Sequence, residues 1–326
     1  MRKVHQIPHL RRIFGTILSM TFRGDYAQGQ GANVNTSSGS GRGGGGGLGN
    51  GAMMLLPLLM RGGGGGAVIL VVLGLLYFSG AFNGILGGGG DESQSQSQGN
   101  YTLEHCQEEG SSNEYDDCRA AATFTSAQKI WGDILPQQAN VDFHPAEMTI
   151  FKNNVTSGCG FASADTGPFY CPRDTTAYLD VSFFEDLGQL GGSNGPLAQE
   201  YATAHEYGHH IQNLEGTLGL SDYKNPGEDS AAVAIELQAD CYAGIWAKYA
   251  SEDGVLEPIT DQQLQEALQT AQSIGDDNIQ RRSGGDVDPD AWTHGSSEQR
   301  AEAFKSGYES GKMASCDTLN RGVYTS

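Results

Sequence analysis

The pattern of hydrophobic and polar positions changes along the chain at about residue 100. Beyond it, apolar residues recur every three or four positions, the spacing of a helix that packs on a core. We therefore expect helices at about 196–215, 230–250, 260–274 and 296–310. Two shorter runs, 148–152 and 176–180, read as strands. The second follows a Pro172-Arg173-Asp174 turn, and we expect an edge strand along which an extended peptide can lie. Together these elements predict an α+β fold.

The first part of the chain has a different pattern. Residues 1–66 are rich in glycine, and 24–66 are of low complexity, so they cannot bury enough apolar surface to fold alone. We predict a disordered tether there. Residues 67–86 are twenty consecutive positions without a charge, enough for a helix to span about 30 Å of hydrocarbon. They predict a transmembrane helix, followed by a linker at 87–100 and one folded domain at 101–322.

Charge differs sharply across that apolar segment. The first 90 residues carry 7 basic and 1 acidic side chains, and the remaining 236 carry 12 basic and 38 acidic ones. By the positive-inside rule, this predicts a single-pass membrane protein with a cytoplasmic amino terminus and an exported domain. So acidic a domain is not expected to bind nucleic acid. A cleaved signal ending near residues 79–81 and a buried core helix are the alternatives for 67–86. Either Met1 or Met20 is compatible with the start of translation.

All six cysteines lie beyond the apolar segment. An even number confined to the exported part favours disulfides formed in an oxidising compartment. Six cysteines allow fifteen pairings. We favour the set that leaves none free: Cys106 with Cys118, Cys159 with Cys171, and Cys241 with Cys316.

One short stretch carries a recognisable chemistry. His205 and His209 are four residues apart, so on a helix both imidazoles point from the same face and can bind one zinc ion. Glu206 stands beside them, as a general base would. His210 is turned about 100° from His209 and is expected to pack or to support the site from outside. The motif predicts a zinc hydrolase.

A catalytic zinc needs a third protein ligand and an open position for water. Glu236 lies in the mostly apolar helical segment 230–246, where an isolated carboxylate is costly to bury without a cation. Asp240 follows four residues later on the same face, placed to accept the second ring N–H of a metal-bound histidine. Two acidic residues on a solvated helix face are the alternative, which the apolar neighbours disfavour.

These two motifs together resemble the gluzincin branch of the zinc peptidases. The tail, with His294 and Arg300, resembles the His-Pro-Ser/Thr-x-x-x-Arg element of membrane-associated CAAX-processing zinc peptidases, although Gly295 stands in the place of proline. From about residue 100 to 318 the chain is similar to the bacterial family of putative neutral zinc metallopeptidases. The segments that carry this similarity are 169–172, 177–180, the His205 helix, 236–241 and 293–297. The resemblance implies a zincin-like domain on a membrane anchor, with one zinc per chain and an unassigned substrate.

The chemistry expected from these residues is peptide hydrolysis. Glu206 would take the proton of a zinc-bound water and later protonate the leaving amine. The tetrahedral intermediate also needs a hydrogen-bond donor, for which His294 is the first candidate and Arg300 the second. His294 also fits an entry to the capping box at Ser296, and Arg300 a surface ion pair.

We therefore predict a membrane-anchored zinc endopeptidase acting on polypeptides. A non-hydrolytic zinc-dependent chaperone or scaffold of the cell envelope is one alternative, disfavoured because binding zinc does not require Glu206. A hydrolase of a non-peptide amide is another.

Overall fold

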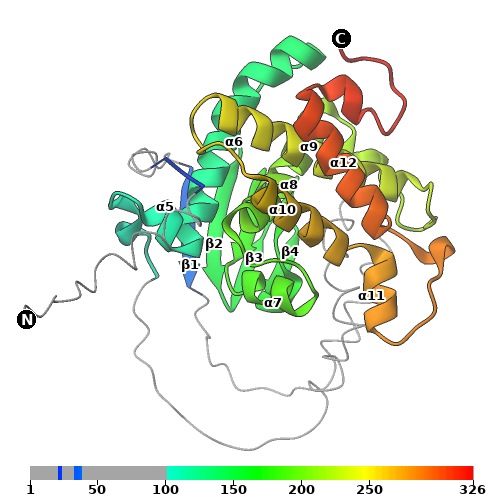
Figure 1. Ribbon diagram of the computed structural model, residues 1–326, viewed down its shortest axis with the longest axis horizontal. Helices are drawn as coiled ribbons and strands as arrows, with labels where there is room; N and C mark the ends of the chain where they lie inside the picture. Colours follow the sequence, from blue (N-terminus) through cyan, green and yellow to red (C-terminus); the bar gives the residue numbers. More distant parts are fainter. Residues whose placement is uncertain (1–20, 24–32, 39–100, 326) are drawn as a thin grey trace, which may run out of the picture.

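A computed structural model describes residues 21–23, 33–38 and 101–325 and shows an α+β arrangement (Figure 1). One sheet has the strand order β1-β2-β6-β5. Its strands are β1 (Val34–Ser38), β2 (Glu147–Lys152), β6 (Thr176–Asp180) and β5 (Phe169–Cys171). The first three are parallel, and β5 is antiparallel to β6. A separate hairpin of β3 (Asn154–Ser157) and β4 (Gly160–Ser163) follows β2.

Helices cover the sheet and form most of the domain (Figure 1). The longer ones are α6 (Asp116–Ala139), α8 (Pro196–Glu215), α9 (Ala231–Glu252), α10 (Asp261–Ser273) and α12 (Ser297–Ser310). Three shorter ones are α5 (Ser111–Glu114), α7 (Phe183–Gln189) and α11 (Asp276–Arg282). The four predicted helices are confirmed as α8, α9, α10 and α12, to within two residues at each end. Capping boxes begin two of them, at Thr260 and at Ser296.

The strand predicted at 176–180 exists, but the expectation that it forms an edge is wrong. β6 lies between β2 and β5, so both of its edges are paired. The reason is the turn at 172–175, which returns the chain as a hairpin. Within that turn the Asp174 carboxylate accepts a hydrogen bond from the Tyr178 hydroxyl at 2.8 Å. The short strand β5 therefore takes the outer position.

The prediction of disorder over residues 1–66 is wrong for two described parts. Residues 34–38 form β1 on the edge of β2, and Phe22 makes a bridge with Leu256. The composition argument fails here because it asks whether the segment can fold alone. The apolar surface that Phe22 needs is supplied by the domain, whose core buries it completely.

Close contact between α9 and α12 fixes the relative position of two helices that carry predicted site residues. A Cβ added to Gly244 would lie 2.0 Å from the Phe304 carbonyl oxygen, and one added to Gly307 would lie 1.9 Å from that of Cys241. Glycine at both positions lets the two backbones touch. This approach brings Arg300 of α12 against Asp240 of α9.

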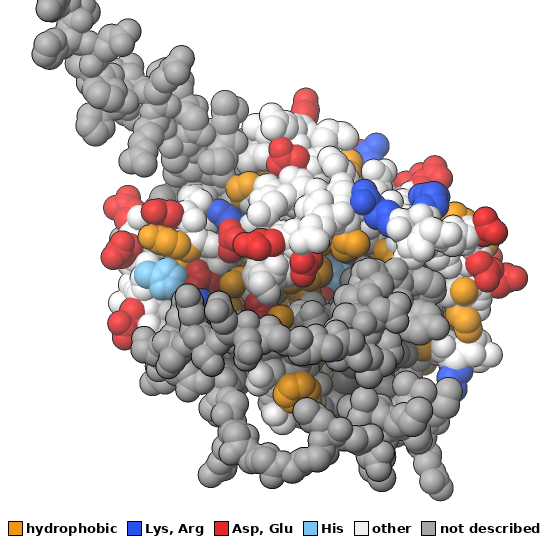
Figure 2. Space-filling view, turned by 90° about the horizontal axis from the view of Figure 1, so that it is seen from below, with side chains coloured by type: hydrophobic (Ala, Val, Ile, Leu, Met, Phe, Trp, Pro, Cys, Tyr) orange, Lys and Arg blue, Asp and Glu red, His pale blue; other side chains and the backbone are white. Residues whose placement is uncertain are grey.

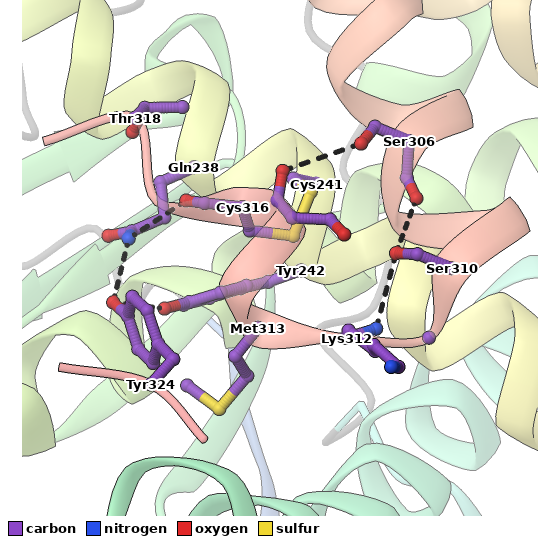
Figure 3. The surroundings of a disulfide bond; sticks show 12 residues. Gln238, Cys241, Tyr242, Ser306, Ser310, Lys312, Met313, Cys316, Thr318 and Tyr324 are labelled. Carbon is purple, nitrogen blue, oxygen red and sulfur yellow. Dashed lines mark hydrogen bonds between the residues drawn. A yellow bond between two sulfur atoms is a disulfide. The ribbon is translucent and has the colours of Figure 1, made fainter. Parts of the chain in front are cut away.

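All three favoured disulfides are present: Cys106–Cys118, Cys159–Cys171 and Cys241–Cys316. Figure 3 shows the third, which ties α9 to the segment after α12. Beside it, the Gln238 side-chain amide donates to the Cys316 carbonyl and to the Tyr324 hydroxyl. The carboxyl-terminal segment is thus fastened to the helix that carries Glu236 and Asp240.

The transmembrane helix predicted at 67–86 and the linker predicted at 87–100 both lie outside the described residues. Within the part that is described, no helix combines the length and apolarity needed to cross a bilayer. Acidic side chains are scattered over the face of the domain seen in Figure 2, in keeping with the excess of Asp and Glu after residue 90.

Candidate metal centre

The centre is built on α8, which begins at Pro196 and ends at Glu215. The next residue, Gly216, adopts a left-handed backbone conformation and caps the helix. His205 and His209 are four positions apart, so their rings lie one above the other, with centroids 4.7 Å apart. Both are buried, with exposures of 6% and 1%. Gly208 faces α9, where an added Cβ would lie 3.0 Å from the Ala239 carbonyl oxygen. Glycine there lets α8 and α9 approach closely enough to share a site.

Together with His205 and His209, Glu236 of α9 completes a set of three side chains that could hold a metal ion. One donor atom from each lies within 4.8 Å of the others. Glu236 Oε2 is 3.3 Å from His205 Nε2 and 3.8 Å from His209 Nε2. This oxygen is buried and accepts no hydrogen bond from any described residue. Two imidazole nitrogens and an unpartnered carboxylate oxygen match the ligand chemistry of zinc.

Asp240 holds the His205 ring in an orientation that suits metal binding through Nε2. Its Oδ1 accepts a hydrogen bond from His205 Nδ1 at 2.8 Å, which leaves Nε2 directed at Glu236. The Tyr201 hydroxyl donates to the same oxygen at 2.6 Å. Although burial lowers the pKa of His205, the Asp240 carboxylate raises it to about 10. The residue expected to orient a ligand histidine therefore contacts one of the two.

Arg300 pairs with Asp240 from the other side. Its Nε donates to Asp240 Oδ2 at 2.8 Å and its Nη2 to Oδ1 at 2.9 Å. Arg300 is only 2% exposed, so the alternative of a surface ion pair does not apply. Its guanidinium neutralises the buried carboxylate and also lines the cavity beside the site.

His209 is oriented by a residue that the sequence did not single out. Gln212 lies three residues later on α8, and its Oε1 accepts a hydrogen bond from His209 Nδ1 at 2.8 Å. The Gln212 amide nitrogen in turn donates to Gln238 and to the Ile235 carbonyl. Burial lowers the pKa of His209 to about 4, which keeps the ring neutral and able to bind a cation. The i, i+3 spacing was the available signal.

Tyr223 is a second residue that was missed. It lies in the loop between α8 and α9, and its hydroxyl donates to Glu236 Oε1 at 3.0 Å. With Oε1 occupied in this way, Oε2 is the oxygen that faces the two histidines. No periodic pattern marks Tyr223, because its position depends on the path of a loop.

Glu206 follows His205 on α8 but is not part of the set of three candidate ligands. Its Oε2 is buried and has no hydrogen-bond partner among the described residues. Burial raises the pKa of Glu206 to about 7, against the opposing effect of positive charge on His205. A carboxyl group with a pKa near neutrality can both accept and return a proton at the same pH.

His294 enters the site from the loop before α12. Its Nδ1 lies 3.0 Å from Asp276 Oδ1. The backbone N–H groups of Thr293, His294 and Gly295 all donate to Asp276 Oδ2. His294 Nε2 is buried and has no partner within the described parts of the chain. Ser296, two residues later, caps α12, so the position of His294 also fits the helix entry that the sequence allowed.

A cavity adjoins these groups. It is lined by Pro168, Phe183, Tyr201, Ala202, His205, Glu206, Ile274, Ile279, His294 and Arg300. The cavity is thus largely apolar, and polar side chains of the candidate site are among its lining residues. His210 is not among the lining residues. Its Nε2 donates to the His144 carbonyl at 2.7 Å and its Nδ1 contacts the Tyr170 hydroxyl, so its packing role is confirmed.

Comparison with known proteins agrees with this geometry. Residues 20–319 match the family model described as putative neutral zinc metallopeptidase. The uncharacterized protein Rv2575 of Mycobacterium tuberculosis is 44% identical over 228 residues, which cover 68% of this chain and 76% of that protein. The uncharacterized protein YpfJ of Escherichia coli K12 is 39% identical over 216 residues, covering 62% of this chain and 73% of YpfJ. No solved structure matches.

Proposed function

Because the chain belongs to the family of putative neutral zinc metallopeptidases, we propose that it is a zinc-dependent endopeptidase with His205, His209 and Glu236 as ligands of a single zinc ion. The observation that carries this is the convergence of their three donor atoms within 4.8 Å. When bound, zinc supplies Lewis acidity and lowers the pKa of a coordinated water toward neutrality. The remaining steps belong to side chains of the protein.

Glu206 is the proposed general base and acid. Its Oε2 has no hydrogen-bond partner among the described residues and is therefore free to take a proton from the attacking water. The resulting carboxylic acid is then placed to give the proton to the amine that leaves when the C–N bond breaks. A pKa of about 7, raised by burial, suits both transfers near neutral pH.

His294 is the proposed donor to the oxygen on which negative charge develops. His294 lines the cavity, its Nε2 is buried without a partner among the described residues, and Asp276 holds Nδ1, so Nε2 is the ring atom left to donate to that oxygen. Such a donor typically contributes about 10²–10³ in rate. Arg300 is less suited to this role, since Asp240 and Tyr201 already accept bonds from its Nε and Nη2.

An extended polypeptide is the proposed substrate. β5 is an outer strand, at one edge of the described sheet, and it packs against α8, the helix that carries Glu206. A peptide added along this edge would be held by backbone hydrogen bonds. The apolar side chains of the cavity, among them Ile274 and Ile279, would then accommodate an uncharged side chain next to the bond that is cut.

The cellular location proposed for this activity is outside the cytoplasm. Three disulfides are expected only in an oxidising compartment. We propose that the zincin-like domain acts in the periplasm or its equivalent, attached to the inner membrane through the apolar residues 67–86.

The test uses the full chain purified in detergent. We expect one zinc per chain by elemental analysis, loss of that zinc in His209→Ala, and its retention in His144→Ala, which removes an exposed imidazole that is not one of the proposed ligands. Glu206→Gln should keep zinc and lose casein hydrolysis. Zinc retained by a parent that cuts no unfolded protein would instead support a non-hydrolytic chaperone or scaffold, and a parent without zinc would refute the proposal.

A further inference from the structure

The two described pieces before residue 39 are docked on the domain at separate places. We call residues 21–23 and 33–38 together the amino-terminal arm. At one end of the arm, Thr21 and Phe22 are 1% and 0% exposed. At its other end, β1 pairs with β2 over five residues, from Val34 opposite Met148 to Ser38 opposite Lys152. The contacts are of the kind found inside a domain.

The first docking place is specific for the backbone of the arm. Asn113 Oδ1 accepts hydrogen bonds from the backbone N–H groups of Thr21 and Phe22, each at 3.0 Å, and its Nδ2 donates to the Phe22 carbonyl at 2.8 Å. On the opposite side, the Glu257 N–H donates to the Thr21 carbonyl at 2.7 Å, and the Arg23 N–H donates to the Val255 carbonyl at 3.1 Å. Every one of these groups would lose its partner if the arm were elsewhere.

This docking reaches the helix that carries the site. The Thr21 hydroxyl donates to Oε1 of Glu200, which is completely buried in α8, five residues before His205. Phe22 belongs to the main core cluster. Burying a phenylalanine side chain typically stabilises by about 1.5–3 kcal/mol, so the contact is not an incidental one.

Side-chain hydrogen bonds also hold the arm at the second docking place, where β1 pairs with β2. Asn33 Nδ2 donates to the Ala146 carbonyl at 3.3 Å, and the Thr36 hydroxyl donates to the Tyr101 carbonyl at 2.9 Å. The match to the family model begins at residue 20, one residue before Thr21. The arm is therefore part of what defines the family rather than an extension outside it.

We propose that the arm is a permanent part of the catalytic domain and lies on the same side of the membrane as the metal centre. A chain that leaves the domain at Ser38 and returns at Tyr101 crosses the bilayer an even number of times or not at all. A single crossing at 67–86 with the amino terminus in the cytoplasm would separate β1 from β2.

The decisive experiment is cysteine labelling of the full chain in intact bacterial spheroplasts with a membrane-impermeant maleimide. Asn35→Cys reports on the arm, because Asn35 is exposed in β1. Lys305→Cys reports on the domain, because the Lys305 side chain is 55% exposed on α12. The native cysteines are all in disulfides and give no background. A cytoplasmic protein with a free thiol checks that the membrane is intact.

We expect equal labelling of the two variants from outside. Asn35→Cys that is labelled only after lysis, beside Lys305→Cys labelled in intact cells, would overturn the proposal. Protection of both would leave arm and domain on one side but would refute the exported location. As a second measurement, Asn113→Ala should lower the melting temperature of the full chain, since its amide bonds only the arm. An unchanged melting temperature would also count against docking.

Discussion

The Arg300→Ala substitution should cost far more stability than the loss of a surface ion pair. Arg300 is 2% exposed and Asp240 is 0% exposed, so the pair is removed from water on both sides. Without the guanidinium, Asp240 loses the two hydrogen bonds at 2.8 and 2.9 Å and stays charged in the core. Breaking a buried pair by removing one partner typically costs about 3–5 kcal/mol.

A matched control is available on α11. Arg281 donates to Asp277 at 2.6 Å, a similar length, but its side chain is 55% exposed. Exposed pairs of this kind contribute about 0.2–1 kcal/mol, so Arg281→Ala should change the free energy of unfolding by no more than that. The two variants thus differ in burial and not in the type of bond.

The assay is urea unfolding followed by circular dichroism, carried out with chelator present so that metal binding does not add to the stability. The free energy of unfolding should fall by several kcal/mol in Arg300→Ala and remain near the parent value in Arg281→Ala. If the two variants lie within about 1 kcal/mol of each other, the buried ion pair does not have the energetic role assigned here.

Two further predictions concern turnover and pH. Asp276→Asn should leave the zinc content unchanged and reduce kcat for casein by up to about 10²–10³, because His294 loses the carboxylate that orients its ring; a normal kcat would show that the contact is only structural. Burial raises the pKa of Glu200 from 4.5 to about 7, so its neutral form stabilises the folded state below pH 4.5 and that stabilisation is lost as the pH rises through 7. At about 1.4 kcal/mol per pKa unit, stability should fall by roughly 3 kcal/mol between pH 5 and 8, and Glu200→Gln should abolish this part of the pH dependence; equal slopes for parent and variant in urea titrations would contradict it.

The elements that the sequence predicted correctly are those set by local spacing. His205, His209, Glu236 and Asp240 lie on two helices, where positions four apart share a face whatever the rest of the fold does. The helix boundaries followed from capping patterns and from glycine beyond the ends.

What the sequence did not reveal depends on contacts between distant segments. Tyr223 and Asp276 reach the site because a loop and a short helix are packed beside α9 and α12, and no spacing encodes that. The edge position of β5 depends on which strands pair, and the pairing of β1 with β2 joins residues more than one hundred positions apart. Composition alone described that part of the chain as a tether.

Binding of the metal and stabilisation of the transition state are supported by different parts of the fold. The three proposed ligands lie on α8 and α9, and α12 is locked to α9 by the glycine contacts and followed by the Cys241–Cys316 disulfide. His294 instead lies in a loop and is held by Asp276, at the start of α11. Loss of Arg300 should therefore appear in the free energy of unfolding, whereas loss of the Asp276 carboxylate should appear in kcat without release of zinc. A variant of Asp276 that also released zinc would show that the two supports are not separate.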